Sequence, residues 1–323
     1  MRKFMTAALI ALCASAHAQA SADYPSRPIR FISISAAGSG GDTLVRLLAD
    51  RMGQLLKTSF VVENKPGASG AIATEMLARA VPDGYTIGIG GATTHVLLPA
   101  SNPKLPYNSI KDFTPLGQVG TASILLIATN DFPANNVKEL VALAKQSPAA
   151  VQYASWGNGS TGHFCGELLK LRTQAQMLHI PYKSVAQIQT DMLGGHIKLA
   201  YVDMASGSPL VKAGRVKALA ACTSRSPSLP AVRSYDEDGI DFQGKRMGAL
   251  RWAVYAPAGT LRPITDKLAA TLKDVVAMPD VQAKLLELGI TASFVAGDEL
   301  RDMTAVDIAA WKKVAADAGI SNE

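Results

Sequence analysis

Hydrophobic positions along this chain alternate between short, strand-like runs and longer stretches with helical spacing. The first clear unit begins with residues 29–34, an isoleucine-rich run that suits a buried strand. Small residues follow over 36–41, and from Leu44 onward apolar side chains recur along one face of a helix. We therefore predict a strand, a glycine-rich loop and a helix whose first turn is capped by Asp42 or Thr43.

The remaining pattern repeats this alternation. Strands that alternate with helices indicate βαβ units, and therefore an α/β fold with parallel strands. The proline-containing stretch 102–115 is predicted to be a surface connection. Further strands are predicted at 60–63, 85–89, 124–128, 151–155, 177–180, 198–202, 216–221 and 252–256, and helices at 71–80, 137–146, 164–172, 186–193, 262–278, 280–288 and 298–318.

The order of these elements predicts two lobes with a ligand cleft between them. We assign residues 21–123 and 252–323 to the first lobe and residues 124–251 to the second. The chain then crosses between the lobes near 121–124 and again near 251–255, a topology that suits hinge closure.

Two loops of this arrangement are candidate anion sites. Residues 35–42 open the first helix, and residues 155–163 repeat the sequence of strand, glycine loop and helix in the second lobe. The first turn of a helix leaves N–H groups unpaired, and its dipole favours negative charge. If the lobes face each other, both loops point into one cleft. For the first loop taken alone, the alternative is a tight turn that binds no ligand.

The first loop does not match a nucleotide-binding motif. The dinucleotide fingerprint requires glycine where this chain has Thr43, and a phosphate-binding P-loop requires a lysine that is absent here. A carboxylate or another small oxyanion therefore remains as the expected ligand.

The N-terminal residues 1–20 read as a signal peptide. Arg2 and Lys3 precede an apolar run that is too short to span a membrane, and Ala18-Gln19-Ala20 forms a small-residue cleavage site. We therefore expect export to the periplasm and a mature chain that begins near Ser21. An exported protein with two lobes and two anion sites is most simply a solute receptor.

Composition limits the kinds of partner and cofactor that this protein is expected to bind. Removing the two charges of Arg2 and Lys3 lowers the formal net charge from +6 to +4, without a basic cluster, so nucleic acid is not an expected partner. No histidine cluster has metal-ligand spacing, and we expect neither a metal nor another cofactor. Export permits a disulfide between Cys165 and Cys222, but their wide separation in sequence leads us to favour two buried thiols.

Several segments resemble one known family. The chain is similar, over nearly its whole mature length, to the extracytoplasmic solute receptors of tripartite tricarboxylate transporters, also called Bug proteins. The resemblance implies a Venus-flytrap fold of the periplasmic binding protein type, a monomer that delivers a small carboxylate to membrane permease subunits, and no enzymatic activity. It rests on residues 24–29, 62–70, 82–86, 104–107, 111–113, 157–160, 179–183, 256–260 and 311–314.

The resemblance also implies a ligand site. In the family, backbone N–H groups and hydroxyls of the two loops hold a ligand carboxylate, and the acidic residue at Asp203 helps to select the far end of the ligand. Trp156 and Tyr182 lie beside the loops and could stack on an aromatic ligand. The expected ligand-binding residues are Ser35, Ala36, Ala37, Gly38, Ser39, Gly40, Gly41, Asp42, Thr93, Thr94, His95, Ser155, Trp156, Asn158, Gly159, Ser160, Thr161, His163, Tyr182 and Asp203.

The identity of the ligand stays open at this point. Relatives usually carry Phe-Pro-Pro-Gly-Gly in the first loop, where this chain has small residues over 35–39, and Ser184 replaces a usual glycine. A roomier wall is consistent with an aromatic dicarboxylate such as terephthalate, and otherwise with a tricarboxylate or another organic acid.

A secreted α/β hydrolase is the alternative class. Ser160 lies near His163 in sequence and could serve an esterase, but Asn158 stands where a nucleophile elbow requires glycine. We interpret Ser160 instead as a helix cap whose hydroxyl binds the ligand carboxylate. We interpret Lys183 as a solvated surface charge. We interpret Trp252 as a residue of the hinge or of the core.

Overall fold

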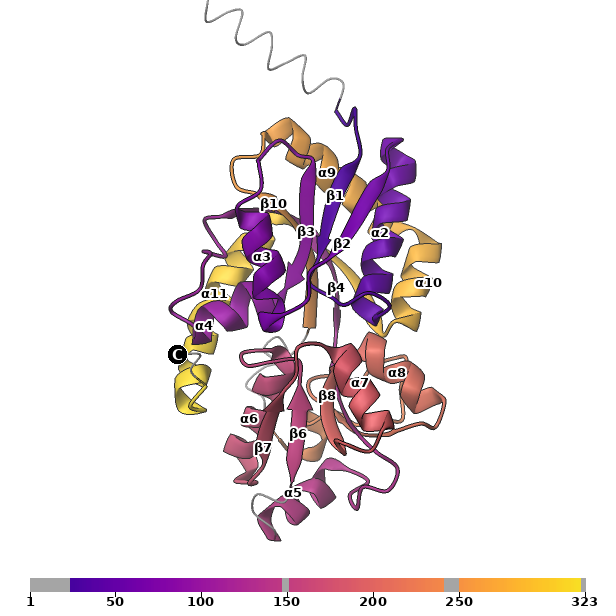
Figure 1. The fold of residues 1–323 in the computed structure, drawn as a ribbon, viewed down its shortest axis with the longest axis vertical. Coiled ribbons are helices and arrows are strands. Elements are labelled where there is room, and N and C mark those ends of the chain that lie inside the picture. The colour runs from indigo at the N-terminus through magenta and orange to yellow at the C-terminus, as the bar shows by residue number, and fades with distance from the viewer. Residues whose placement is uncertain (1–23, 147–150, 241–249, 321–323) are drawn as a thin grey trace, which may run out of the picture.

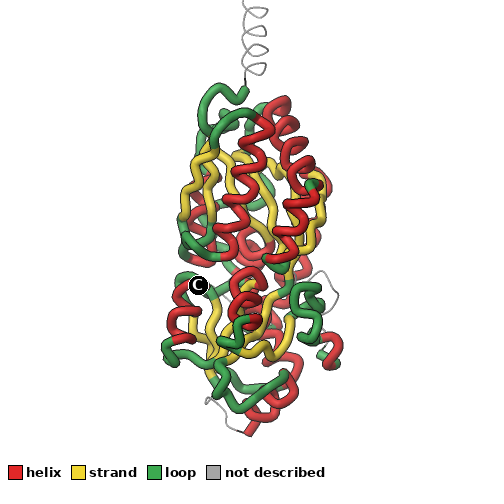
Figure 2. The backbone as a smooth tube through the Cα atoms, turned by 90° about the vertical axis from the view of Figure 1, so that its right-hand side faces the viewer, coloured by secondary structure: helices red, strands yellow, loops and turns green. Residues whose placement is uncertain are grey.

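The computed structural model describes residues 24–146, 151–240 and 250–320, which form two α/β lobes (Figure 1). One lobe is built on a sheet with the strand order β11-β4-β10-β3-β1-β2, and the other on a sheet with the order β7-β6-β8-β5-β9. Figure 2 shows the same lobes stacked along the long axis of the molecule. The predicted two-lobed α/β fold is therefore confirmed.

The first lobe combines parallel and antiparallel strands. The strand β1 pairs in parallel with β2 and β3, whereas β10 lies antiparallel between β3 and β4. In Figure 1 the helices α2 and α10 lie to the right of this sheet, and α3 and α11 to the left. The elements are β1 (Ile29–Ser33), α2 (Gly40–Leu56), β2 (Phe60–Asn64), the short 3-10 turn η1 (Ala68–Gly70), α3 (Ala71–Ala78), β3 (Thr86–Gly91), the π-helical segment η2 (Thr93–Leu97), α4 (Leu98–Ser101), β4 (Phe113–Ala122), β10 (Leu250–Pro257), α9 (Arg262–Ala277), α10 (Pro279–Glu287), β11 (Ile290–Ala296) and α11 (Gly297–Asp317).

The second lobe has a smaller mixed sheet. The strand β6 is parallel to β7 and β8, while β5 is antiparallel to β8 and β9. The elements are β5 (Ile124–Ala128), α5 (Val137–Gln146), β6 (Gln152–Ser155), α6 (Thr161–Thr173), β7 (Leu178–Pro181), α7 (Val185–Leu193), β8 (Leu199–Asp203), α8 (Met204–Lys212), β9 (Lys217–Ala221) and the 3-10 turn η3 (Asp236–Asp238).

The connection between the two sheets is short. Ser123 alone separates β4 from β5, and β10 lies antiparallel beside β4 on the first-lobe side of this crossing. The C-terminal helix α11 also reaches the second lobe, because the Trp311 ring packs edge-on against Phe164 of α6 at a centroid distance of 5.0 Å. The lobes are therefore joined both by the strand crossing and by the packing of α11.

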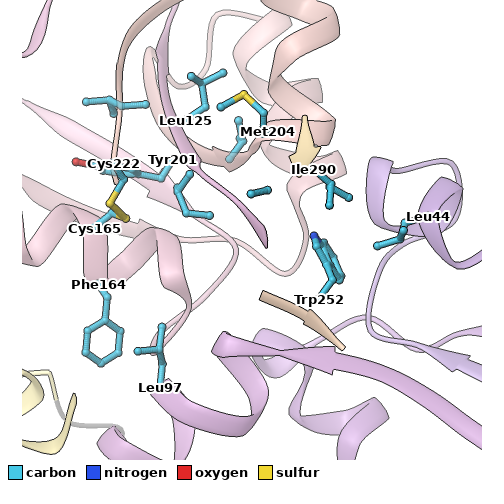
Figure 3. Close-up of a cluster of buried hydrophobic side chains, with 14 of the residues drawn as sticks. Leu44, Leu97, Leu125, Phe164, Cys165, Tyr201, Met204, Cys222, Trp252 and Ile290 are labelled. Carbon is cyan, nitrogen blue, oxygen red and sulfur yellow. A yellow bond between two sulfur atoms is a disulfide. The ribbon is translucent and has the colours of Figure 1, made fainter. Parts of the chain in front are cut away.

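The hydrophobic core continues through this junction. Leu44 of α2 and Ile290 of β11 belong to the same buried cluster as Leu125 and Met204 of the second lobe (Figure 3). Gly289 lets this packing occur, since a Cβ atom there would lie 2.1 Å from the Met204 side chain. Substantial apolar burial thus supports the junction near the cleft.

Of the elements longer than five residues, three were not predicted from the pattern. The strand β4 begins at Phe113, inside the stretch 102–115 that was predicted to be a surface connection, and that prediction is wrong at its C-terminal end. Gly117 and Gly120 interrupt the β4 pattern because β11 approaches closely: a Cβ on Gly120 would lie 2.5 Å from the Thr291 carbonyl oxygen. The strand β11 itself and the helix α8, which contains Pro209, were also missed.

Cys165 and Cys222 form a disulfide, so the prediction of two buried thiols is wrong. Cys165 lies on α6 and Cys222 directly follows β9, with a Cα–Cα distance of 6.1 Å (Figure 3). The helix α6 packs on β5 and β8, and β9 pairs with β5, so the fold brings together residues separated by 57 positions. This proximity cannot be read from their spacing in sequence.

The helices in the part of the chain that the structure describes lack the length and apolar character needed to cross a membrane. The predicted signal peptide, residues 1–20, lies outside the described residues.

Candidate functional site

A cavity of about 70 Å³ lies where the two lobes meet. This volume is several times the roughly 10–15 Å³ that one water molecule requires, so the cavity has room for a small solute. Loops from both lobes and the start of β10 contribute to its wall. The lining residues are Ile34, Ser35, Ala36, Ser39, Gly41, Pro66, Gly67, Ser69, Gly70, Gly90, Gly91, Ala92, Thr93, Trp156, Lys183, Ser184, Val185, Ala186, Asp203, Arg251 and Trp252.

Four helices begin at this cavity. Ser39 and Gly70 are the N-cap residues of α2 and α3 in the first lobe, and Ser184 and Asp203 are those of α7 and α8 in the second. Each N-terminus presents N–H groups that the helix itself cannot pair, together with the positive end of its dipole. The cavity therefore favours an anionic ligand from both sides of the cleft.

The first loop is shaped by its small residues. The Ser39 hydroxyl caps α2 by accepting a hydrogen bond from the Asp42 N–H and donates to the Ala36 carbonyl oxygen at 2.7 Å. A Cβ atom on Gly41 would lie 2.1 Å from the Ser35 hydroxyl oxygen, so only glycine fits at this position. The helix cap is Ser39, and the prediction of Asp42 or Thr43 as the cap is wrong because the helix already begins at Gly40, before both residues.

The Asp42 carboxylate stabilises this loop through hydrogen bonds. Its carboxylate accepts hydrogen bonds from the Gly38 N–H at 2.9 Å, from Arg46 at 3.0 Å and from Asn64 at 2.8 Å. Burial alone would raise the pKa of Asp42, but the hydrogen bonds from Arg46, Asn64 and Gly38 hold it below its usual value. Asp42 is thus an ionised loop support that does not line the cavity.

The serine hydroxyl groups of the second loop form hydrogen bonds within their own lobe. The Ser160 hydroxyl is fully buried, accepts a hydrogen bond from the His163 N–H at 3.2 Å and donates to Ser155 at 3.1 Å. Ser155 in turn lies 2.7 Å from the His179 ring nitrogen. Of residues 155–163, Trp156 alone lines the cavity, and Asn158 is exposed to solvent.

The buried histidines His95, His163 and His179 do not line the cavity. The rings of His163 and His179 stack at 4.0 Å, and the Gly159 N–H donates to the His163 Nδ1 atom. Burial lowers the pKa of His163 to about 4 and that of His179 to about 3. His95 stacks on Tyr255 at 3.8 Å, and burial lowers its pKa to about 3. All three rings are therefore neutral near pH 7.

Direct contacts hold the lobes together across the cleft. The Thr93 hydroxyl lies 2.8 Å from the Thr161 hydroxyl and also accepts a hydrogen bond from the Thr161 N–H. The Ser69 hydroxyl donates to the Asn158 carbonyl oxygen at 2.8 Å. The structure therefore represents a closed arrangement, in which Thr93, Asn158 and Thr161 take part in contacts between the lobes.

The cavity wall also contains polar residues from outside the two predicted loops. Asp203 accepts a hydrogen bond from the Ser206 N–H at 2.9 Å, while burial, partly opposed by such hydrogen bonds, raises its pKa. Arg251 of β10 is buried and donates to Asp307 of α11 at 2.6 Å. Lys183 is exposed and lies on the wall contributed by the second lobe.

The structure divides the predicted site residues into two groups. Those that line the cavity are Ser35, Ala36, Ser39, Gly41, Thr93, Trp156 and Asp203. Those that do not line it are Ala37, Gly38, Gly40, Asp42, Thr94, His95, Ser155, Asn158, Gly159, Ser160, Thr161, His163 and Tyr182, whose hydroxyl donates to Asp191.

Sequence reasoning missed several lining residues. Ser69 and Gly70 precede α3, and Ser184 caps α7. Each position follows a strand and precedes a helix, and a serine or glycine there indicates a helix start that the sequence could have revealed. Arg251 and Trp252 carried no such signal, because only the antiparallel return of β10 brings them to the cavity. Among the described residues there is no histidine, cysteine or carboxylate group arranged to hold a metal ion.

Comparison with known proteins places this chain in a family. Residues 44–320 match the family model described as "Tripartite tricarboxylate transporter family receptor". The chain belongs to this receptor family. An UPF0065 protein of Bordetella pertussis is 33% identical over 281 residues, which cover 86% of this chain and 84% of that protein.

Solved structures of similar proteins agree with the two-lobed fold. The periplasmic binding protein BugD is 32% identical with a TM-score of 0.86, over 92% of this chain and 99% of that one. An R. palustris protein, Rpa4515, solved with adipate, is 31% identical with a TM-score of 0.87, over 93% and 99% of the two chains. The receptor therefore has the fold of periplasmic solute-binding proteins, and the family resemblance seen in its sequence is confirmed.

Proposed function

We propose that this receptor captures a small organic carboxylate in the closed cleft and delivers it, as a monomer, to the permease subunits of a tripartite transporter in the cytoplasmic membrane. Residues 1–20 direct its export to the periplasm and are removed, so N-terminal sequencing of the periplasmic protein should begin at Ser21. An intact Met1 on that protein would contradict this part of the proposal.

The convergence of four helix N-termini on one cavity is the observation that carries the proposal. The helices α2 and α3 approach from the first lobe, and α7 and α8 from the second, so a carboxylate between them would bridge both lobes. Ligand bonds to both lobes favour the closed arrangement, because a ligand stabilises the state that it binds better. This coupling of capture to closure is what a transport receptor requires.

The contacts of Ser160 argue against hydrolysis. Its hydroxyl is fully buried, caps α6 and is bonded to Ser155, and it does not line the cavity. A nucleophile must reach the substrate carbonyl carbon, and Ser160 has no such access. We therefore propose binding without catalysis and set aside the esterase alternative.

Two ligand types fit the proposal. Trp156 supplies a flat aromatic surface on the cavity wall, which supports an aromatic dicarboxylate such as terephthalate through stacking. The adipate in the R. palustris structure supports an aliphatic dicarboxylate. Tyr182 is held by Asp191 away from the cavity and contributes nothing to either choice.

A thermal-shift screen tests the proposal. Terephthalate, adipate, malate, citrate and benzoate are added to the mature receptor, and the midpoint of unfolding is recorded for each. A ligand at roughly 100 times its dissociation constant should add about 2.7 kcal/mol to the free energy of unfolding. A shift of the unfolding midpoint with at least one acid supports the proposal. If no acid shifts the midpoint and the protein instead hydrolyses an ester substrate, the hydrolase is favoured.

A further inference from the structure

The cavity wall contains a buried cation whose role the family assignment does not explain. His95 aside, the buried acidic and basic residues of the described chain are Asp42, Asp203 and Arg251, and two of these line the cavity. A buried charge is unfavourable unless it is paired or serves a ligand. The question is therefore which groups balance the positive charge of Arg251.

Its protein partner satisfies only part of the guanidinium group. The Arg251 Nη2 atom donates to the Asp307 carboxylate at 2.6 Å, with both side chains largely buried. A guanidinium group carries several N–H donors in a planar fork and does not lose its proton. Among the described residues, Asp307 is the one side-chain acceptor that Arg251 has, and the cavity is the adjacent space in which a second acceptor could sit.

The position of Arg251 differs from that of the helix N-termini. It belongs to β10, the strand that returns beside β4 next to the crossing between the lobes, whereas Lys183 is exposed on the second-lobe wall. The cavity thus has one cation exposed to solvent and another buried near the hinge. Asp203 caps α8 on the second-lobe wall, and its carboxylate offsets part of that helix's attraction for an anion, which favours the Arg251 side for a second negative group.

We propose that Arg251 binds a second carboxylate of the ligand, and that this makes the receptor selective for dicarboxylates over monocarboxylates of the same shape. This inference rests on the proposed function and names its ligand class. The first carboxylate occupies the helix N-termini, and the second forms a charge-assisted hydrogen bond with Arg251 near the hinge. Asp307 pairs with one side of the guanidinium group and leaves its other N–H donors for the ligand.

Matched pairs of acids test this inference. Adipate is compared with hexanoate, and terephthalate with 4-methylbenzoate, by titration calorimetry on the mature receptor. Each pair differs by replacing one carboxylate with a methyl group, so the ratio of the two affinities reports on the second carboxylate alone. The expected result is that at least one diacid binds about tenfold or more tightly than its partner.

Two variants separate the charge of Arg251 from its ion pair. Arg251→Gln removes the cation and breaks the pair, and should abolish the preference for the diacid while changing the monoacid affinity by less than about threefold. Asp307→Asn also breaks the pair but keeps the cation, and should retain the preference. Arg225→Gln, on the surface and paired with Glu237, removes the same net charge and should change neither affinity.

The outcomes distinguish the inference from the proposed function. If the wild-type receptor binds monoacid and diacid equally, or if Arg251→Gln and Asp307→Asn abolish the preference alike, the inference is wrong while carboxylate binding stands. If neither member of either pair binds, the proposed function and the inference built on it both fail. Circular dichroism of each variant confirms that it is folded before titration.

Discussion

The hydroxyl groups of Thr93 and Thr161 lie 2.8 Å apart and join the two lobes across the cleft. Thr93 begins η2 in the first lobe, and Thr161 begins α6 in the second. Both residues are buried, so each hydroxyl depends on the other lobe for its hydrogen bond. The contact therefore contributes to closure and would be lost on opening.

Thr93→Val should shift the unliganded receptor toward an open arrangement. Valine keeps the shape of threonine but removes the hydroxyl, which leaves the Thr161 hydroxyl and N–H without this partner at a cost of roughly 1–3 kcal/mol in the closed state. Small-angle scattering should show a larger radius of gyration than for the wild type. Thr271→Val, which removes a buried hydroxyl within α9, is the control, and an unchanged radius for Thr93→Val would contradict a closing role.

Gly40→Ala should prevent full closure by steric overlap. A Cβ atom at this position would lie 2.5 Å from the Ala205 Cβ atom on the opposite lobe, whereas the glycine itself lies in an ordinary helical turn. Ligand affinity should fall about tenfold or more, with little change in unliganded stability. Titration calorimetry measures the affinity of this variant, and Thr43→Ala, an exposed position in the same helix, is the control. If Gly40→Ala binds ligand as tightly as the control, the lobes do not close to this distance.

The disulfide should contribute substantially to the stability of the second lobe. Cross-linking residues separated by 57 positions restricts the unfolded chain, which the loop-entropy relation values at about 4 kcal/mol. The double variant Cys165→Ala, Cys222→Ala should lose about 2–4 kcal/mol in urea unfolding. A thiol assay on the unreduced wild type is the companion test, and two reactive thiols under denaturing conditions would rule out the bridge.

Acid should destabilise the receptor through its buried histidines. Burial lowers the pKa values of His95 and His179 to about 3 and that of His163 to about 4, below the unfolded value of about 6.5. As pH falls below about 6.5, the unfolded chain binds protons that the folded chain does not, so stability decreases until the folded pKa values are reached. Each ring adds up to about 1.4 kcal/mol per pH unit to this slope.

His179→Gln tests this account because glutamine can keep the hydrogen bond to Ser155 without titrating in this range. Urea unfolding at pH 7, 6, 5 and 4 should give a slope smaller than that of the wild type, by up to about 1.4 kcal/mol per pH unit below about pH 6. An identical slope in the two proteins would mean that His179 does not stay neutral in the folded state.

The sequence predicted the parts of the fold that depend on local pattern. The strands β1 and β6, each a short apolar run followed by a glycine loop, were placed correctly, although the cap of the helix after β1 was assigned to the wrong residue. The strand β4 was missed because Gly117 and Gly120 serve its close approach to β11, which is a tertiary requirement. The disulfide was missed for a related reason, since it depends on how α6 packs over the sheet.

The candidate site shows the same limit. The first loop was recognised from its glycines and its position after a strand, and Ser35, Ser39 and Gly41 do line the cavity. Ser160 was interpreted as a ligand contact, but in three dimensions its hydroxyl turns into the lobe and bonds to Ser155. Arg251 gave no local signal, because it reaches the cavity only through the antiparallel pairing of β10 with β3 and β4.

The central claim is that helix N-termini from both lobes hold a ligand carboxylate. Titration calorimetry of adipate and terephthalate against their diamides tests it most directly, because the amides keep the shape and remove the charge. The account predicts that at least one acid binds with one ligand per receptor, and that its diamide binds roughly 10–100 times more weakly, the range expected for losing charge-assisted hydrogen bonds. Equal affinity for an acid and its diamide would contradict the account, because the helix N-termini would then not be recognising a carboxylate.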